Sequence, residues 1–335
     1  MKIAVVGAGA IGGLVAAYLK EKGEDVYLVG RGDSVDFIIK NGLKISGVRG
    51  DRHVIIDTHR GLVSRPELVI LALKTQDIDS FFGENKGFFT DSVVLTTQNG
   101  VQADNIVAKY VPSANIVSSI VMFGATHISD GKVVHNFEGD WVIGRMSGTP
   151  EDEKTNSIGV VLDKAFQTVI SEDIRGMKYL KVFVNANNCI PAILGVSMQE
   201  AFCDPAMSRI SIAIWKEGFE VTSKSGIKLT SLPGFPLENM TKLLSMPADE
   251  AARIFSGIMA KLSSDPLYGS ILQSIKRGRS SEIDYINGEF VSLAEKNRMA
   301  VPLNKRLVEM VHEVERTKRF FSKEELLSNV KGLSD

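Results

Sequence analysis

The sequence predicts an α/β N-terminal domain followed by a mainly α-helical C-terminal domain. In the first half, short apolar runs rich in β-branched residues alternate with helical patterns, which is typical of a parallel sheet covered by helices. After about residue 170 these runs disappear, and apolar residues recur at a spacing of about 3.6 residues. The length of 335 residues also suits two domains. We therefore expect one domain over residues 1–169 and a second over residues 170–335.

The first strand, helix and second strand follow one another directly. Residues Lys2–Val6 form a continuous apolar run, which is typical of a strand buried on both faces. A helical pattern continues through Lys22 and ends at Gly23, and Asp25–Val29 is the next strand. This order predicts two parallel strands joined by a helix.

The same patterns assign the remaining elements. Apolar runs predict three further strands of the sheet, at residues 67–73, 93–97 and 116–123. The alternating pattern at residues 131–144 predicts a hairpin added to that sheet. Helical periodicity predicts helices at residues 176–194, 204–225, 248–262 and 281–296, and a Pro and Gly cluster at residues 231–236 separates two helical segments.

The composition excludes several classes of protein. Apolar residues make up 44% of the chain and charged residues 24%, which are ordinary values for globular proteins and argue against a disordered, collagen-like or coiled-coil chain. The 39 basic residues nearly balance the 40 acidic residues, so the chain has no large net charge to attract nucleic acid or an anionic membrane. We expect neither as a partner.

The cysteines and the N-terminus carry further expectations. Cys189 and Cys203 belong to no CxxC or Cys/His cluster, so the sequence predicts no disulfide framework and no metal site. No apolar run is long enough to span a membrane, and the run that follows Met1 is too short for the core of a signal peptide. These features predict a cytoplasmic location.

A glycine-rich segment lies between the first strand and its helix. It consists of Gly7, Ala8, Gly9, Ala10, Ile11 and Gly12. In this position glycines allow a tight turn, let a pyrophosphate approach the bare backbone, and let the helix pack on the strand. An ordinary flexible turn is the alternative, but the flanking strand and helix favour a Rossmann dinucleotide-binding loop.

Arg31 favours NADP over NAD as the dinucleotide. An NAD enzyme usually ends its second strand with Asp or Glu, which binds the ribose 2′-hydroxyl. Here the strand ends at Val29 and Gly30, and Arg31 follows. A guanidinium can pair with a 2′-phosphate through two hydrogen bonds. The alternatives are a solvent-exposed loop arginine and a ribose contact by Asp33.

Two further strand ends carry polar residues. Lys74 follows the strand at residues 67–73, and Asn99 follows the strand at residues 93–97. Because doubly wound sheets bind ligands at the carboxyl ends of their strands, both residues can reach cofactor or substrate. Lys74 could instead be a solvated residue at a strand end, and Asn99 with Gly100 could form a tight turn.

The first predicted helix of the second domain carries polar residues within an apolar pattern. These are Lys181, Asn185, Asn188 and Cys189, whose spacing places them on one face. Desolvation lowers the pKa of a buried lysine toward the range in which it can act as a general acid. The structural alternatives are a lysine whose charged end reaches solvent and asparagines that cap a neighbouring helix.

The densest polar segment comes later in the chain. It begins at Tyr268, includes Ser270, and continues after three basic residues to Ser281 and Glu282. Ser281 could cap the helix that contains Glu282, with the acidic residues of the first turn complementing the helix dipole. That account leaves Ser270 and the clustering of polar residues unexplained, which favours a binding site.

Over nearly the whole chain, these residues resemble the ketopantoate reductase (2-dehydropantoate 2-reductase) family. The resemblance rests on the glycine loop, Leu73-Lys74-Thr75, Asn99-Gly100, the Lys181-x-x-x-Asn185 helix, and Ser270 with the segment from Ser281 to Gly288. The last segment, SEIDYING, is the most specific. The resemblance implies NADPH-dependent reduction of ketopantoate, a 2-oxo acid, to (R)-pantoate in pantothenate and coenzyme A synthesis.

The resemblance also implies a role for each residue. Lys181 would be the general acid for the ketone oxygen, and Glu282, the second catalytic residue, would hold the substrate hydroxyl. Asn185 and Asn99 would position substrate and nicotinamide, and Ser270 would contact the substrate carboxylate. NADPH would be bound by the residues from Gly7 to Gly12 together with Arg31, Lys74, Asn99 and Glu282.

One position departs from the family pattern. Many members have a second asparagine eight residues after the catalytic lysine, often followed by proline, whereas this chain has Cys189 there and the proline is displaced to Pro191. Asn188 lies one residue earlier, about 100° around a helix, and is expected to bind substrate from a different angle. This departure makes another branched 2-oxo acid the first alternative substrate.

A non-catalytic NADP-sensing protein is the second alternative. Lys181 and Glu282 argue against it, because a sensor needs no acid beside the nicotinamide. A homodimer formed through the helical half is compatible with the sequence, which contains no pattern that decides the oligomeric state.

Overall fold

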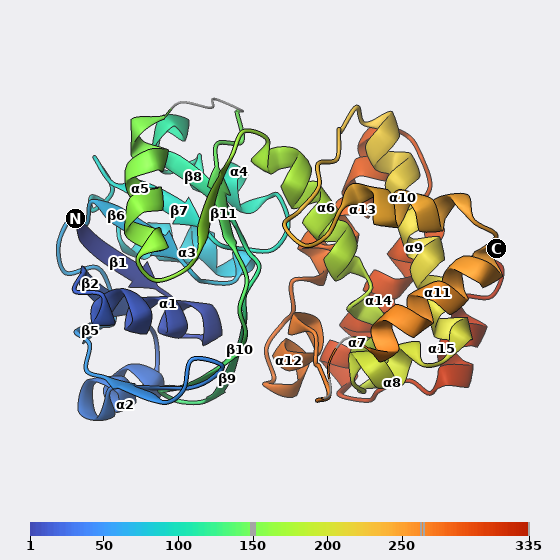
Figure 1. Cartoon of the computed structure of the whole chain (residues 1–335), viewed down its shortest axis with the longest axis horizontal. Helices are drawn as coiled ribbons and strands as arrows, with labels where there is room; N and C mark the ends of the chain where they lie inside the picture. The colour runs from blue at the N-terminus through green and yellow to red at the C-terminus, as the bar shows by residue number, and fades with distance from the viewer. Residues whose placement is uncertain (148–151, 262, 264, 334–335) are drawn as a thin grey trace. The chain divides into compact units, whose positions relative to one another are not determined.

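The computed structural model describes residues 1–147, 152–261, 263 and 265–333. It divides into two compact units, Met1–Arg175 and Gly176–Asp335 (Figure 1). The first is a Rossmann-type α/β unit and the second is mainly α-helical, which confirms the predicted fold class. The expected domain boundary at residues 169 and 170 falls inside strand β12 (Thr168–Ser171), which belongs to the first unit.

A large sheet forms the centre of the first unit, and its described strands are ordered β12-β11-β8-β7-β6-β1-β2-β5. From β8 to β5 all neighbouring strands are parallel, whereas β11 runs antiparallel to β8. Besides β12, the strands are β1 (Lys2–Val6), β2 (Asp25–Val29), β5 (Thr58–His59), β6 (Leu68–Leu71), β7 (Val93–Thr96), β8 (Ile116–Val121) and β11 (Trp141–Gly144).

Helices cover both faces of this sheet. They are α1 (Ala10–Glu21), α2 (Asp33–Asn41), α3 (Ile78–Glu84), α4 (Ala103–Val107) and α5 (Glu153–Asp163), with 3-10 turns η1 (Thr75–Asp77) and η2 (Ser113–Asn115). In β1, Ile3 and Val5 belong to a core cluster with α1 and α2, whereas Ala4 and Val6 belong to a second cluster with α3 and α4. Because successive side chains of a strand point to opposite faces, β1 needs apolar residues throughout.

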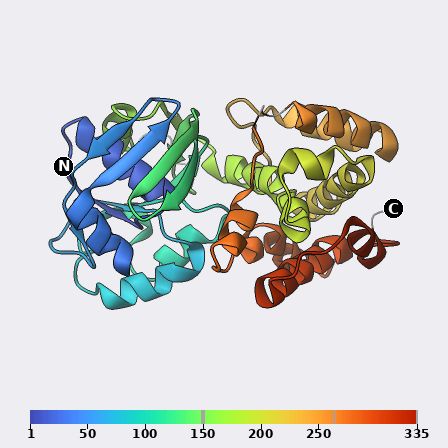
Figure 2. The ribbon, with the colours of Figure 1, turned by 90° about the horizontal axis from the view of Figure 1, so that it is seen from below.

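The remaining strands of this unit form a second sheet, in the order β4-β3-β10-β9. They are β3 (Leu43–Gly47), β4 (Arg52–Val54), β9 (Gly124–Ser129) and β10 (Lys132–Phe137). Figure 2 shows strands from the blue and green parts of the chain side by side in this sheet. The prediction of a hairpin at residues 131–144 in the large sheet is therefore wrong: β10 pairs with β9 and β3, and only β11 joins the large sheet.

The described part of the second unit contains helices and no strand of either sheet. Its helices are α6 (Ile174–Ala186, which begins at the end of the first unit), α7 (Cys189–Leu194), α8 (Met198–Phe202), α9 (Pro205–Lys224), α10 (Leu237–Ser245), α11 (Ala248–Ala260), α12 (Ser270–Lys276), α13 (Asn287–Lys296), α14 (Pro302–Thr317) and α15 (Lys323–Asn329), with the 3-10 turn η3 (Ile283–Tyr285). Throughout the residues that the structure describes, none of the helices combines the length and apolar character needed to cross a membrane.

Helix α6 is held between α9 and α13. The indole nitrogen of Trp215 in α9 donates a hydrogen bond to the carbonyl oxygen of Phe183 in α6, at 2.7 Å. The Phe183 ring packs against that of Phe290 in α13, with 4.8 Å between ring centroids. These contacts fix the position of α6 within the helical unit.

Two of the predicted helices are interrupted. The expected helix at residues 176–194 consists of α6 and α7, separated at Asn187 and Asn188. The expected helix at residues 281–296 consists of η3 and α13, with Ile286 between them. Buried apolar residues occur on both sides of each break, so the apolar period alone could not reveal the breaks.

Phe166 provides a test of the core of the first unit. Its buried ring stacks on Phe123 at 4.3 Å between centroids and meets Trp141 edge-on. We expect Phe166→Ala to lower the free energy of unfolding by about 3–5 kcal/mol, because it removes buried apolar surface and leaves a cavity. Urea unfolding measures this loss. The control, Phe137→Ala, changes a ring that is 47% exposed and should cost far less; equal losses would contradict this account of the core.

Candidate active site

The loop between β1 and α1 is closely packed on one side and open on the other. A β-carbon added at Gly12 would collide with the carbonyl oxygen of Gly7, and one added at Gly7 would lie 2.5 Å from the carbonyl oxygen of Ala72. A β-carbon at Gly9 would meet nothing within 4 Å. Helix α1 has no side-chain cap and no acidic residue in its first turn. Its free backbone N–H groups therefore fit an anion such as a pyrophosphate, which could approach over Gly9.

The predicted residues of the first unit follow neighbouring strands. Because β7, β6, β1 and β2 are adjacent and parallel, their carboxyl ends meet at one edge of the sheet. The structure places Asn99 after β7, Lys74 after β6 and Arg31 after β2, with the glycine loop after β1. The sheet thus brings these predicted cofactor contacts to one edge, where doubly wound folds bind ligands.

The loops that carry Lys74 and Asn99 are tied together by Gln98. The buried amide of Gln98 donates hydrogen bonds to the carbonyl oxygens of Leu71 (2.9 Å) and Leu73 (3.0 Å). Lys74 is half-buried at the start of η1, and Asn99 precedes Gly100, whose φ is +85°. Asn99 and Gly100 lie in a bend of the chain, and the Asn99 side chain is partly exposed.

In the second unit, Lys181 and Asn185 lie one turn apart on α6. Lys181 is only partly exposed, and burial lowers the pKa of its ammonium group to about 8. Asn185 is buried in the last turn of the same helix. A lysine with this pKa carries a proton near neutral pH and can release it to a developing oxyanion.

Asn188 and Cys189 lie beyond the end of α6, which corrects the expectation that all four residues belong to one continuous helix. The chain tightens after α6, with the Asn188 backbone N–H donating to the Asn185 carbonyl oxygen at 2.9 Å, and α7 begins at Cys189. The Asn188 side chain packs on Gly269, where an added β-carbon would lie 2.9 Å from Asn188 Cγ. Asn188 thus lies beside the start of α12, at Ser270.

Cys189 is fully buried and lies against Asn287. The Asn287 amide nitrogen is 3.8 Å from the sulfur, and burial raises the pKa of the Cys189 thiol to about 12. The same amide nitrogen donates to Asn304 Oδ1 at 3.0 Å, and Asn304 Nδ2 donates to Glu217 at 2.8 Å. Cys189 is therefore a protonated packing residue at the end of a buried polar chain, not a nucleophile.

The Glu282 segment is anchored by α14. The Ser281 backbone N–H donates to Glu315 Oε1 at 2.6 Å, and the His312 ring lies between Asp284 (2.9 Å) and Glu315 (3.2 Å). Burial of His312 opposes its protonation, but the hydrogen bonds and charges of Asp284 and Glu315 outweigh burial and raise its pKa. Glu282 itself is buried. Helix α14 therefore holds the loop that carries Glu282.

The expectation that Ser281 caps the long helix is wrong. The Ser281 hydroxyl accepts a hydrogen bond from the backbone N–H of Ile283 (3.3 Å), the first residue of η3, whose N-cap is Glu282. Helix α13 begins only at Asn287, and the acidic residue of its first turn is Glu289. Glu282 therefore does not lie in the first turn of α13, and an interaction with the dipole of that helix does not explain its position.

Three buried polar residues were not singled out from the pattern. Lys178 is buried one turn before Lys181 on α6, and Asn287 belongs to the SEIDYING segment. Both amide atoms of Asn187 are buried without a hydrogen-bond partner in the described structure. The sequence offered two signals, a charged residue (Lys178) within an apolar run and three asparagines within four positions. Only the fold shows that these side chains are buried.

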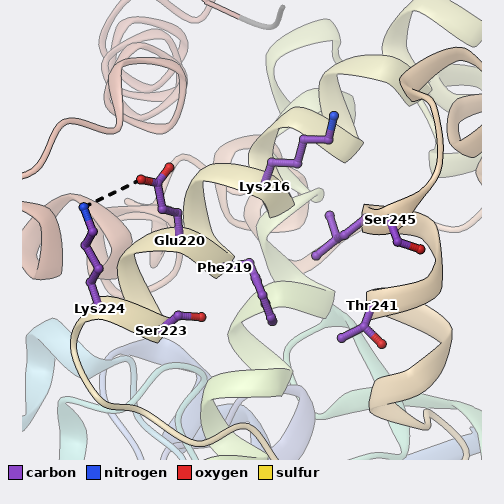
Figure 3. Close-up of a pocket in the computed structure, with 8 residues that line it drawn as sticks. Lys216, Phe219, Glu220, Ser223, Lys224, Thr241 and Ser245 are labelled. Carbon is purple, nitrogen blue, oxygen red and sulfur yellow. Dashed lines mark ion pairs between the residues drawn. The ribbon is translucent and has the colours of Figure 1, made fainter.

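A surface pocket of about 550 Å³ lies apart from these residues, between α9 and α10 (Figure 3). It is lined in part by Phe219, Thr241 and Leu244, and Lys224 pairs with Glu220 at its edge, at 3.9 Å. None of the predicted site residues lines it.

Comparison with known proteins gives consistent matches. Residues 3–148 match the family model "Ketopantoate reductase PanE/ApbA", and residues 173–315 match its C-terminal counterpart. The 2-dehydropantoate 2-reductase of Pyrococcus horikoshii is 30% identical over 91% of this chain and 94% of its own length. That of Archaeoglobus fulgidus is 27% identical over 94% and 98%.

Solved structures share the fold. D-mandelate dehydrogenase in its ternary structure with NADH and anilino(oxo)acetate has a TM-score of 0.81 and 24% identity, covering 95% of this chain and 99% of that chain. A PanE/ApbA family ketopantoate reductase from Ralstonia eutropha has a TM-score of 0.80 and 22% identity, with the same coverage.

Two glycine variants separate packing from ligand approach in the β1–α1 loop. Gly9→Ala places a methyl group in open space, so we expect thermal stability close to that of the wild type but weaker dinucleotide binding. Gly12→Ala forces a collision with the backbone of Gly7 and should lower the melting temperature. Calorimetric titration and thermal unfolding distinguish the two. Unchanged dinucleotide binding by Gly9→Ala would count against this loop as the pyrophosphate site.

His312→Gln tests the anchor of the Glu282 loop. Because the folded-state pKa of His312 is raised, its contribution to stability is fully present below the unfolded pKa of about 6.5 and is lost as pH rises through the folded value. The cluster is partly exposed, so we expect a stability difference below about 1 kcal/mol from the wild type. Urea unfolding should show this difference shrinking as pH rises above about 6.5, and a constant or growing difference would disprove the assignment.

Proposed function

Because the chain belongs to the ketopantoate reductase family, we propose that it is an NADPH-dependent 2-dehydropantoate 2-reductase, which reduces ketopantoate to (R)-pantoate in the pathway to pantothenate and coenzyme A. The observation that carries the proposal is the pKa of Lys181, which lies on α6 of the helical second unit and whose pKa is lowered to about 8. Such a group suits the protonation of a carbonyl oxygen during reduction.

The first unit supplies the groups that would hold the dinucleotide. The N-terminus of α1 and the open side of Gly9 suit the pyrophosphate, and Arg31, Lys74 and Asn99 lie at the same sheet edge. When bound, the reduced nicotinamide supplies a hydride to C2 of the 2-oxo acid. Glu282 would contribute a further contact to the cofactor.

Lys181 is the proposed proton donor. Its ammonium group would stabilise the negative charge that develops on the C2 oxygen and then transfer a proton to it, leaving the hydroxyl of the product and a neutral amine. Burial makes this transfer easier, because it disfavours the charged form of the lysine. Exchange with solvent then restores the proton.

Four further residues are proposed to orient the substrate. Asn185, on the same helix as Lys181, and Asn188, packed beside the start of α12, offer amide groups within the second unit. Ser270 is proposed to bind the substrate carboxylate and Glu282 its hydroxyl. The anchor on α14 would keep Glu282 in place.

Cys189 favours a second candidate substrate, another branched 2-oxo acid. The thiol is buried against Asn287 and cannot provide the two hydrogen-bonding groups of an amide. A substrate that needs fewer polar contacts at this position than ketopantoate would therefore be favoured. The proposed mechanism at Lys181 is the same for both candidates.

The direct test follows NADPH oxidation at 340 nm with ketopantoate and with a panel of other 2-oxo acids. We expect turnover with ketopantoate, and Lys181→Ala should lower kcat by about 10²–10⁴-fold while leaving NADPH affinity unchanged. Lys216→Ala, which removes an exposed lysine of α9, is the matched control and should behave as the wild type. Activity on another 2-oxo acid alone would make that acid the substrate in place of ketopantoate. No turnover with any 2-oxo acid would refute the proposal that the protein is a reductase.

The pH profile tests the state of Lys181 independently. As a general acid the lysine must be protonated, so kcat should fall as pH rises through about 8. Lys181→Arg should have lower activity but no falling limb in this range, because a guanidinium stays charged. An activity that rises through pH 8 in the wild type would exclude Lys181 as the proton donor.

A further inference from the structure

A second arginine, Arg60, follows strand β5 beside the end of β2, and the sequence pattern does not reveal it. Strand β5 (Thr58–His59) pairs in parallel with the end of β2, and the Gly30 backbone N–H donates to the His59 carbonyl oxygen at 3.0 Å. Arg60 and Arg31 therefore both follow the carboxyl ends of adjacent parallel strands. They lie at the corner of the sheet where a Rossmann fold holds the adenosine ribose.

The two guanidinium groups are held toward opposite faces of the sheet. Arg60 contacts the Gly32 carbonyl oxygen (3.3 Å) and Asp36 of α2 (2.6 Å). Arg31 lies 3.5 Å from Glu84 of α3. Because α2 and α3 belong to core clusters on opposite faces, the two arginines flank the turn that follows β2.

Without the two arginines, carboxylates would make this corner of the sheet negatively charged. Asp33 and Asp36 lie in the first turn of α2, Glu84 ends α3, and an oxygen of Asp57 lies 2.8 Å from the His59 ring. A carboxylate at the end of β2 suits the two hydroxyls of an unphosphorylated ribose and repels a 2′-phosphate. The ion pair with Arg60 neutralises Asp36.

We propose that Arg60 is a specificity-determining residue for a 2′-phosphorylated dinucleotide. Its guanidinium both neutralises Asp36 and offers its remaining N–H donors to the phosphate, opposite Arg31. With one arginine on each side of the turn, the site provides the paired charge that a phosphate dianion needs. This inference rests on the proposed use of NADPH.

The test measures binding without turnover. The full chain is titrated with NADPH and with NADH by calorimetry in the absence of any 2-oxo acid. Arg60→Gln should weaken NADPH binding by about 10- to 100-fold and change NADH binding by less than about twofold, because the two cofactors differ only in the 2′-phosphate. Adding Asp36→Asn to Arg60→Gln should restore part of the NADPH affinity.

Arg52→Gln is the matched control. Arg52 is an exposed arginine of the same unit, paired with Glu21 of α1, and its loss should leave the affinities for both cofactors unchanged. Equal weakening of both cofactors by Arg60→Gln, unchanged NADPH binding, or a double variant no better than Arg60→Gln would overturn the inference. Because no substrate is present, a failure to reduce any 2-oxo acid leaves this result unaffected, so the two proposals fail separately.

Discussion

The close contact between Gly7 and Gly12 is the constraint on which the first unit depends. Without side chains at these positions, the start of α1 can lie directly on the end of β1, and the backbone of the loop reaches Ala72 after β6. Gly30 extends the same packing, since a β-carbon there would lie 2.9 Å from that of Ala8. The ends of three strands are thereby brought together around free N–H groups, and the site is built from backbone before any side chain contributes.

The second unit reaches its chemistry in a different way, through burial. Contacts of Phe183 with α9 and α13 hold α6 in place, and burial lowers the pKa of Lys181. Hydrogen bonds from α14 hold the Glu282 loop. Helices thus set the environment of the proposed proton donor, while the residues proposed to bind substrate lie where helices begin or end.

Much of the fold and of the candidate site could be predicted because each signal is local. Strands β1 and β2 have the predicted bounds, since burial on both faces leaves an unbroken apolar run. Features that depend on contacts between distant segments could not be predicted. These are the pairing of β10 with β3 in the second sheet and the packing of Asn188 on Gly269. Arg60 could not be predicted as a site residue, because β5 has only two residues and is too short to show a strand pattern in the sequence. The roles of the site residues remain predictions.

The parallel pairing of β10 with β3 has a consequence for how the first unit forms. Residue Lys44 of β3 lies opposite Lys132 of β10, and β6, β7 and β8 of the large sheet are all made in the interval between synthesis of these two strands. During synthesis on the ribosome, β3 would emerge long before β10 and could not pair with it until β10 had also emerged. Pairing between segments so far apart in the chain closes a long loop, which slows folding, so the second sheet is expected to assemble late, around a Rossmann core already in place.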